Sequence, residues 1–121
     1  MTDIHLEFLK PDEIGVFLRH LIDLKLDGLL ISGDIVPAAG LRRSLEHFAH
    51  FLDAPIYFVL GNHDFWGSDI PDVRAEMTAL TAENRRIGWL PALGVVELAP
   101  GVALVGHDGW GDGRNGDFMR S

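Results

Sequence analysis

The sequence predicts an α/β fold built around a parallel β-α-β crossover. Residues 55–60 are expected to form a buried strand, because β-branched and aromatic residues fill this run and a glycine ends it. Residues 29–32 form a shorter apolar run that a glycine also ends. Between the two runs, residues 39–52 place apolar side chains at helical spacing. Such a crossover is right-handed by default, so both strands end at the same edge of the sheet.

Two further helices are predicted on either side of this unit. Residues 11–25 have an amphipathic pattern, and Pro11 suits the first helical turn. A third helix is expected over about residues 71–86, again opened by a proline and preceded by polar residues that suit a helix cap.

The C-terminal part predicts a β-hairpin. Apolar runs at residues 95–98 and 102–105 flank Pro100-Gly101, which is a favourable turn pair. No closing element is predicted for the glycine- and aspartate-rich residues that follow, up to residue 121. The fold class predicted is therefore an incomplete α/β domain over residues 1–121, with a parallel β-α-β core and a C-terminal hairpin.

Composition excludes several classes of function. With 121 residues, of which 47% are hydrophobic, the chain forms one domain at most. The 18 acidic and 10 basic side chains give a net charge of −8, and no run of Lys or Arg is longer than a pair. Binding to nucleic acid or to an anionic membrane is therefore not expected, because it calls for a basic face. The absence of cysteine excludes disulfides and thiolate metal sites. With no membrane-length apolar stretch and no signal peptide, a cytoplasmic location is expected.

Three polar motifs follow one another along the chain, and the last two come directly after predicted strands. They are Asp3-x-His5, Gly33-Asp34 and Gly61-Asn62-His63-Asp64. Taken singly, Asp34 also fits a helix cap, Asn62 a turn residue and His63 a hydrogen-bonded loop histidine. Because ligands of open α/β sheets bind at the carboxyl ends of strands, the ordered set favours a functional site at this edge.

This arrangement resembles the calcineurin-like metallophosphoesterase superfamily, whose signature is Asp-x-His, Gly-Asp and Gly-Asn-His-Asp/Glu in this order. The resemblance covers most of residues 3–66 and implies an α/β sandwich that hydrolyses a small phosphate mono- or diester at a dinuclear metal site. The roles that it implies are as follows: Asp3 and His5 ligate a first metal, Asp34 bridges two metals, Asn62 ligates the second, His63 protonates the leaving group or steadies the phosphoryl group, and Asp64 holds the imidazole of His63.

The chemistry of these residue types agrees with the resemblance. A carboxylate shared by two divalent cations holds them close enough to clamp the attacking and leaving oxygens of a displacement. Mixed carboxylate, imidazole and amide ligands favour manganese, iron or zinc over calcium or copper(I). Gly33 and Gly61 are expected to allow sharp backbone turns where a Cβ would clash.

The sequence also departs from the family pattern. Only Met1-Thr2 precede Asp3, where family members have an apolar strand, and no Gly-His-x-His occurs. On the family scheme the first metal lacks one histidine and the second lacks two. His107 is open to two interpretations, as a metal ligand or as part of the rim of the site.

Two hypotheses follow. In the first, the chain is the N-terminal part of a longer dinuclear phosphoesterase. In the second, it is a small non-catalytic metal-binding or interaction module that retains half of the site. We expect the chain to bind at most one divalent ion tightly and to show little or no turnover of an aryl phosphate. An exposed sheet edge would also favour self-association.

Overall fold

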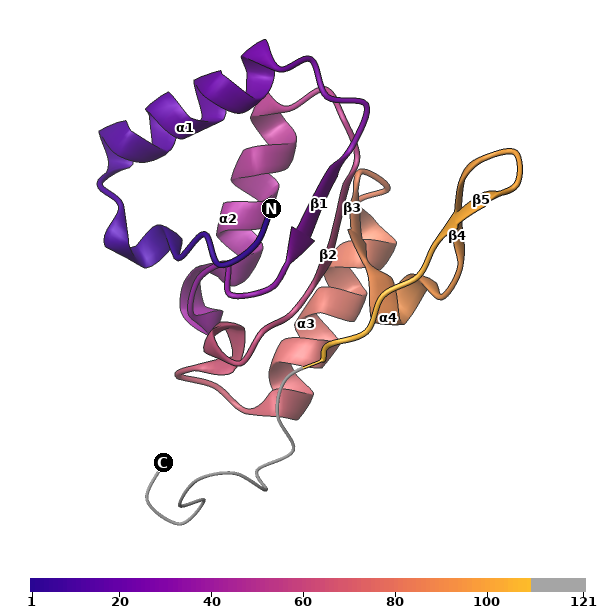
Figure 1. Ribbon diagram of the computed structural model, residues 1–121. Helices are drawn as coiled ribbons and strands as arrows, with labels where there is room; N and C mark the ends of the chain where they lie inside the picture. The colour runs from indigo at the N-terminus through magenta and orange to yellow at the C-terminus, as the bar shows by residue number, and fades with distance from the viewer. Residues whose placement is uncertain (110–121) are drawn as a thin grey trace.

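The computed structural model describes residues 1–109, which form a parallel sheet packed against helices and a hairpin that projects away from them (Figure 1). The sheet has the strand order β1-β2-β3. Its strands are β1 (Leu29–Ser32), β2 (Ile56–Val59) and β3 (Ile87–Trp89). Both pairings are parallel, with Leu29 opposite Ile56 and Ile56 opposite Ile87. The predicted parallel crossover is confirmed.

Helices follow the strands at nearly the expected positions. They are α1 (Pro11–Asp23), α2 (Ala38–Phe51), α3 (Ile70–Glu83) and the short α4 (Leu90–Leu93), with 3-10 turns η1 (Leu6–Phe8) and η2 (His63–Phe65). Helix α1 begins at a proline, and the side chain of Glu13 accepts a hydrogen bond from the backbone N–H of Lys10. No helix in the described part of the chain is long and apolar enough to cross a membrane.

The core lies on one face of the sheet. Leu29 and Ile31 of β1 are buried while the alternate residues Leu30 and Ser32 are exposed, as a strand covered on one side requires. The buried strand residues belong to one apolar cluster with buried residues of three helices. The members from these three helices are Leu18 and Leu21 of α1, Ala38, Leu41, Leu45, Phe48 and Ala49 of α2, and Val73, Met77 and Leu80 of α3.

The N-terminal residues lie along the outer edge of β1. The amino group of Met1 donates to the carbonyl of Leu30, and the N–H of Ser32 donates to the carbonyl of Met1. The N–H of Asp3 then donates to the carbonyl of Gly33 at 3.1 Å. Although residues 1–3 are not a regular strand, this pairing carries Asp3 to the carboxyl end of the sheet.

One strand and one α-helix, β3 and α4, were not predicted from the sequence. Strand β3 has only three residues, one of them a glycine, and only residues 84–86 separate it from α3, so it gives no distinct apolar run. Helix α4 is a single turn that follows at once. The third helix also ends at Glu83, before the predicted residue 86.

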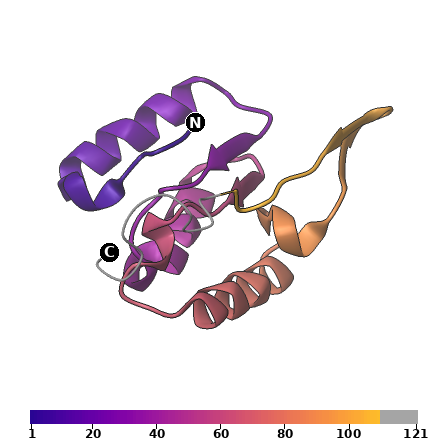
Figure 2. The ribbon, with the colours of Figure 1, turned by 60° about the horizontal axis from the view of Figure 1, so that its bottom comes forward.

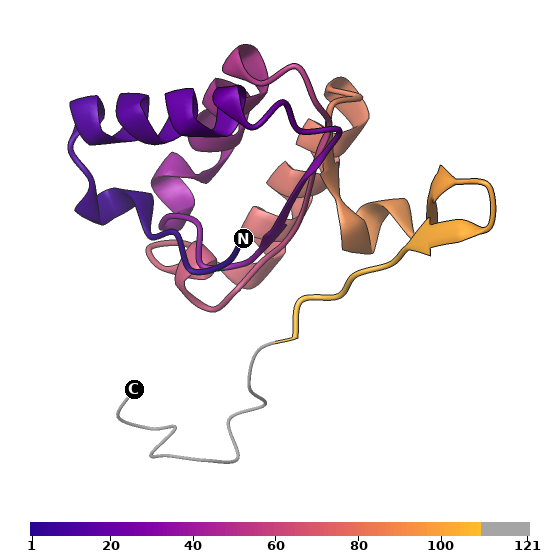
Figure 3. The same ribbon diagram turned by 45° about the horizontal axis from the view of Figure 1, so that its top comes forward.

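The predicted C-terminal hairpin is confirmed. Strands β4 (Val96–Ala99) and β5 (Val102–Leu104) pair antiparallel, and Gly101 in the turn has φ of 78°. Figures 2 and 3 show the hairpin extending away from the sheet and the helices. Its side chains are largely exposed, including Leu98 and Val102.

Candidate metal centre

The loops that follow β1 and β2 lie against each other at the carboxyl edge of the sheet. Ser32 pairs with Val59, so the next residues of both strands meet. Gly33 has φ of +87°, and a Cβ there would lie 2.6 Å from the backbone nitrogen of Gly61. A Cβ on Gly61 would overlap the carboxylate of Asp34. Only glycine fits at these two positions, as the sequence predicts.

The structure brings together three of the predicted ligands. Side-chain ligand atoms of Asp3, His5 and Asp34 all lie within 4.8 Å of one another. The three residues have positive φ angles of 51°, 42° and 52°, a region that non-glycine residues seldom adopt. Backbone strain of this kind is found at sites where surrounding structure enforces it. Here it coincides with the residues expected to hold a metal.

Backbone hydrogen bonds hold these ligands in place. The N–H of His5 donates to the carbonyl of Asp34 at 3.1 Å, and the N–H of Leu6 donates to the carbonyl of Ile35 at 2.9 Å. The Nε2 atom of His5 lies 3.8 Å from Oδ2 of Asp34. The imidazole and the carboxylate therefore face each other across a gap that a cation would bridge.

Asp34 also contacts the turn that follows β2. Its Oδ1 atom accepts a hydrogen bond of 3.1 Å from the backbone N–H of His63. Asn62, the residue before, is exposed and opens the 3-10 turn η2. Asp34 and Asn62 thus come to one edge as expected, and the ligand role of Asn62 stays a prediction.

Asp64 does not hold the imidazole of His63, so that expectation is corrected. Its carboxylate is fully buried and accepts hydrogen bonds of 2.7–3.1 Å from the backbone N–H groups of Asp34, Ile35, Val36 and Gly61. Backbone N–H groups of two loops converge here, and each needs a hydrogen-bond acceptor. The Asp64 carboxylate accepts several of these hydrogen bonds at once, so it pairs with them and not with the imidazole of His63. Burial raises the pKa of the Asp64 carboxyl above its ordinary value, while the four N–H donors act in the opposite direction.

The ring of His63 is held by aromatic contacts instead. It stacks on Trp66, with ring centroids 3.8 Å apart, and meets the ring of His5 edge-on at 4.8 Å. Its Nδ1 atom is buried, and no hydrogen-bond partner for it exists within residues 1–109. A buried ring nitrogen without a partner is unusual and suits a site that binds a cation or a polar ligand.

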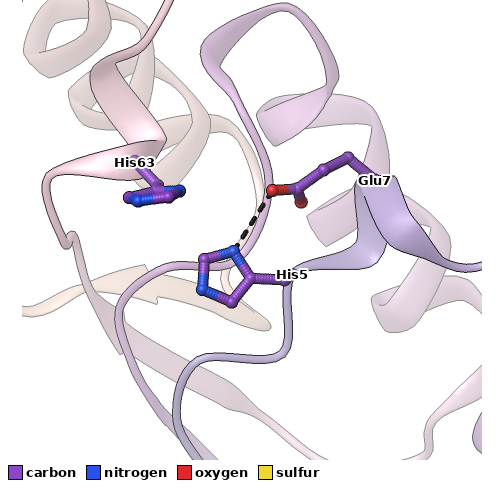
Figure 4. A group of neighbouring side chains, drawn as sticks. All are labelled: His5, Glu7 and His63. Atoms are coloured by element: carbon purple, nitrogen blue, oxygen red, sulfur yellow. Dashed lines mark hydrogen bonds and ion pairs between the residues drawn. The ribbon is translucent and has the colours of Figure 1, made fainter.

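A second group of ligand atoms shares His5. Its ligand atoms also lie within 4.8 Å of one another, and they belong to His5, Glu7 and His63 (Figure 4). Glu7 was not singled out from the sequence, although its place two residues after His5 is a signal that was available.

Asp108 is another residue that sequence reasoning missed. Its buried carboxylate accepts hydrogen bonds from the N–H of Leu60, from Nε1 of Trp89 and from the guanidinium of Arg74. It therefore attaches the segment after β5 to the end of β2. The neighbouring His107 is exposed and belongs to neither ligand group found among the described residues.

Comparison with known proteins agrees with this geometry. The fold and the carboxylate–imidazole cluster are those of an α/β protein with a candidate metal site. The sequence model of the calcineurin-like phosphoesterase family matches residues 1–119, and the chain belongs to this family. Neither the comparison with curated proteins nor that with solved structures gave a match.

The residues present fit a divalent cation. Two carboxylates and an imidazole converge from two separate segments. The ring of His63, whose Nδ1 atom has no partner within the described residues, meets the ring of His5. Oxygen and imidazole ligands in this combination suit manganese, iron or zinc.

Proposed function

We propose that this site hydrolyses a small phosphate mono- or diester with the help of two divalent metal ions. The observation that supports this most directly is the convergence of Asp3, His5 and Asp34 within 4.8 Å. They lie beside His63, on loops where the family signature predicts ligands. A net charge of −8 opposes the binding of an anionic substrate, so cations at the site are needed to attract one.

The ligands divide between the two ions. Asp3, His5 and Asp34 would hold the first ion, while Asp34 and Asn62 would hold the second. Manganese, iron or zinc matches this ligand set. The second ion has fewer ligands in this chain, so it would bind more weakly than the first.

Bound ions would neutralise phosphate charge and make a water molecule nucleophilic at neutral pH. The chain's own residues would orient the reaction. His63, stacked on Trp66 and packed edge-on against His5, would pass a proton to the leaving-group oxygen. Asp64 would have a structural role, because its carboxylate joins the two loops that carry Asp34 and His63.

A second candidate function is a non-catalytic metal-binding or interaction module. Two observations favour it: no Gly-His-x-His occurs in the sequence, and His107 lies outside both ligand groups of the described residues. In this case one ion would bind at Asp3, His5 and Asp34 without turnover.

Hydrolysis of p-nitrophenyl phosphate and of bis-p-nitrophenyl phosphate in the presence of Mn²⁺ separates the two functions. We expect low turnover by the chain, since histidine ligands of the family are missing. Activity above that of Asp34→Ala and His63→Ala variants would support hydrolysis, because a contaminating enzyme would be unaffected by these changes. Equal background rates in all three proteins, with metal still bound by the unsubstituted chain, would support the module.

A further inference from the structure

The two ring nitrogens of His5 have different surroundings. Nδ1 lies 3.2 Å from Oε1 of Glu7, whereas Nε2 lies 3.8 Å from Oδ2 of Asp34. Figure 4 shows the contact between Glu7 and His5, with His63 approaching from another loop. The side chain of His5 is thus placed between an outer carboxylate and the predicted metal ligand.

The contact with Glu7 determines which nitrogen carries the proton. An ionised carboxylate only accepts hydrogen bonds, so Nδ1 of His5 must donate the proton in this contact. In a neutral imidazole the lone pair is then on Nε2, the nitrogen that faces Asp34. A metal-binding histidine typically donates its other N–H to a carboxylate or carbonyl in this way.

The backbone of a 3-10 turn places Glu7 next to His5. This turn is η1, which the buried side chain of Leu6 anchors to the core. The rings of Phe8 and His63 are also close to the imidazole of His5, with centroids 5.8 Å and 4.8 Å away. These contacts favour the ring orientation in which Nδ1 of His5 faces Glu7.

We propose that Glu7 is a positioning residue that fixes the proton of His5 on Nδ1 and so leaves Nε2 free to ligate the metal beside Asp34. This rests on the proposed function only in that His5 is taken as a ligand. The competing interpretation makes Glu7 itself a ligand, together with His5 and His63, whose ligand atoms also lie within 4.8 Å. That arrangement would need Nδ1 of His5 without its proton.

The first test determines which ring nitrogen of His5 carries the proton in the metal-free protein. Long-range ¹H–¹⁵N spectra, recorded where the imidazole is neutral, show which nitrogen of His5 is protonated. We expect the Nδ1–H form in the unsubstituted chain and in Glu7→Gln, whose amide oxygen still accepts the bond. In Glu7→Ala this preference should be lost. An Nε2–H form in the unsubstituted chain, or no change in Glu7→Ala, would overturn the proposal.

The second test measures Mn²⁺ affinity by calorimetry. Glu7→Ala should weaken binding about 10- to 100-fold, the usual effect of removing such a partner, and Glu7→Gln should weaken it less. Glu76→Ala, which removes an exposed carboxylate from α3, is the control and should change nothing. Equal losses for both Glu7 variants would identify Glu7 as a ligand and overturn the positioning role. Neither test requires turnover, so failure of the hydrolytic function would be recognised separately.

Discussion

The loops at the sheet edge and the C-terminal hairpin are opposite kinds of structure. Residues 33–36 and 61–66, here called the edge loops, surround a fully buried carboxylate that pairs with four backbone N–H groups. The β4–β5 hairpin pairs only with itself and exposes apolar side chains, among them Val102 at 53%. Polar contacts therefore hold the edge loops together, whereas we expect the hairpin to contribute little to the geometry of the candidate site.

The largest effect is expected from Asp64→Ala. Four backbone N–H groups lose their acceptor, and each buried donor without a partner costs about 1–3 kcal/mol, so we expect a loss of roughly 3 kcal/mol or more after partial rehydration. Urea unfolding measures it. Asp53→Ala, which removes an exposed carboxylate, is the control and should stay within about 0.5 kcal/mol. A loss below about 1 kcal/mol for Asp64→Ala would show that the edge loops do not depend on this carboxylate.

Asp34→Gly separates stability from metal binding. Glycine adopts the φ of 52° without strain, so the metal-free protein should change by less than about 1 kcal/mol despite the lost contact to His63. The unsubstituted chain should gain about 2.7 kcal/mol from Mn²⁺ at about 100 times its Kd, and the variant should gain almost none. Thermal unfolding with and without Mn²⁺ provides the comparison. Equal stabilisation of both proteins would place the ion elsewhere.

Gly61→Ala should destabilise the protein by about 1–3 kcal/mol, because the added Cβ overlaps the carboxylate of Asp34. Gly15→Ala is a matched control within α1, where a Cβ meets nothing within 4 Å. This control should raise stability by up to about 1 kcal/mol, the helix propensity difference. Chemical unfolding measures the stability of both variants. Equal stability of Gly61→Ala and Gly15→Ala would contradict the account.

The smallest effect is expected in the hairpin. Val102→Thr changes an exposed side chain and should alter the free energy of unfolding by no more than about 0.5 kcal/mol. Mn²⁺ affinity, measured by calorimetry, should be unchanged. A marked loss of affinity would show that the hairpin supports the site after all.

Periodicity and topology made much of the fold predictable. The run at residues 29–32 matches β1, and a right-handed crossover brings the ends of β1 and β2 together, which placed Asp34 beside the turn at Asn62. Strand β3 lacked such a signal, because three residues with a central glycine form no recognisable apolar run.

Side-chain direction within the site was less predictable. The sequence places Asp64 next to His63, but the carboxylate points toward backbone N–H groups that need an acceptor. The positions of these N–H groups depend on how two loops that are distant in sequence meet. The partners of Asp108 are likewise far away in sequence, as its contact with the N–H of Leu60 shows. Contacts of this kind follow from packing and leave no local pattern.

The central claim is that Asp3, His5 and Asp34 hold one divalent ion at the edge of the sheet. Metal analysis after equilibrium dialysis against Mn²⁺ tests it most directly, with the unsubstituted chain, Asp34→Ala and the control Asp53→Ala. The account predicts one tightly bound ion per chain, retained in Asp53→Ala and lost in Asp34→Ala. Two tightly bound ions, or an ion that Asp34→Ala retains, would contradict it.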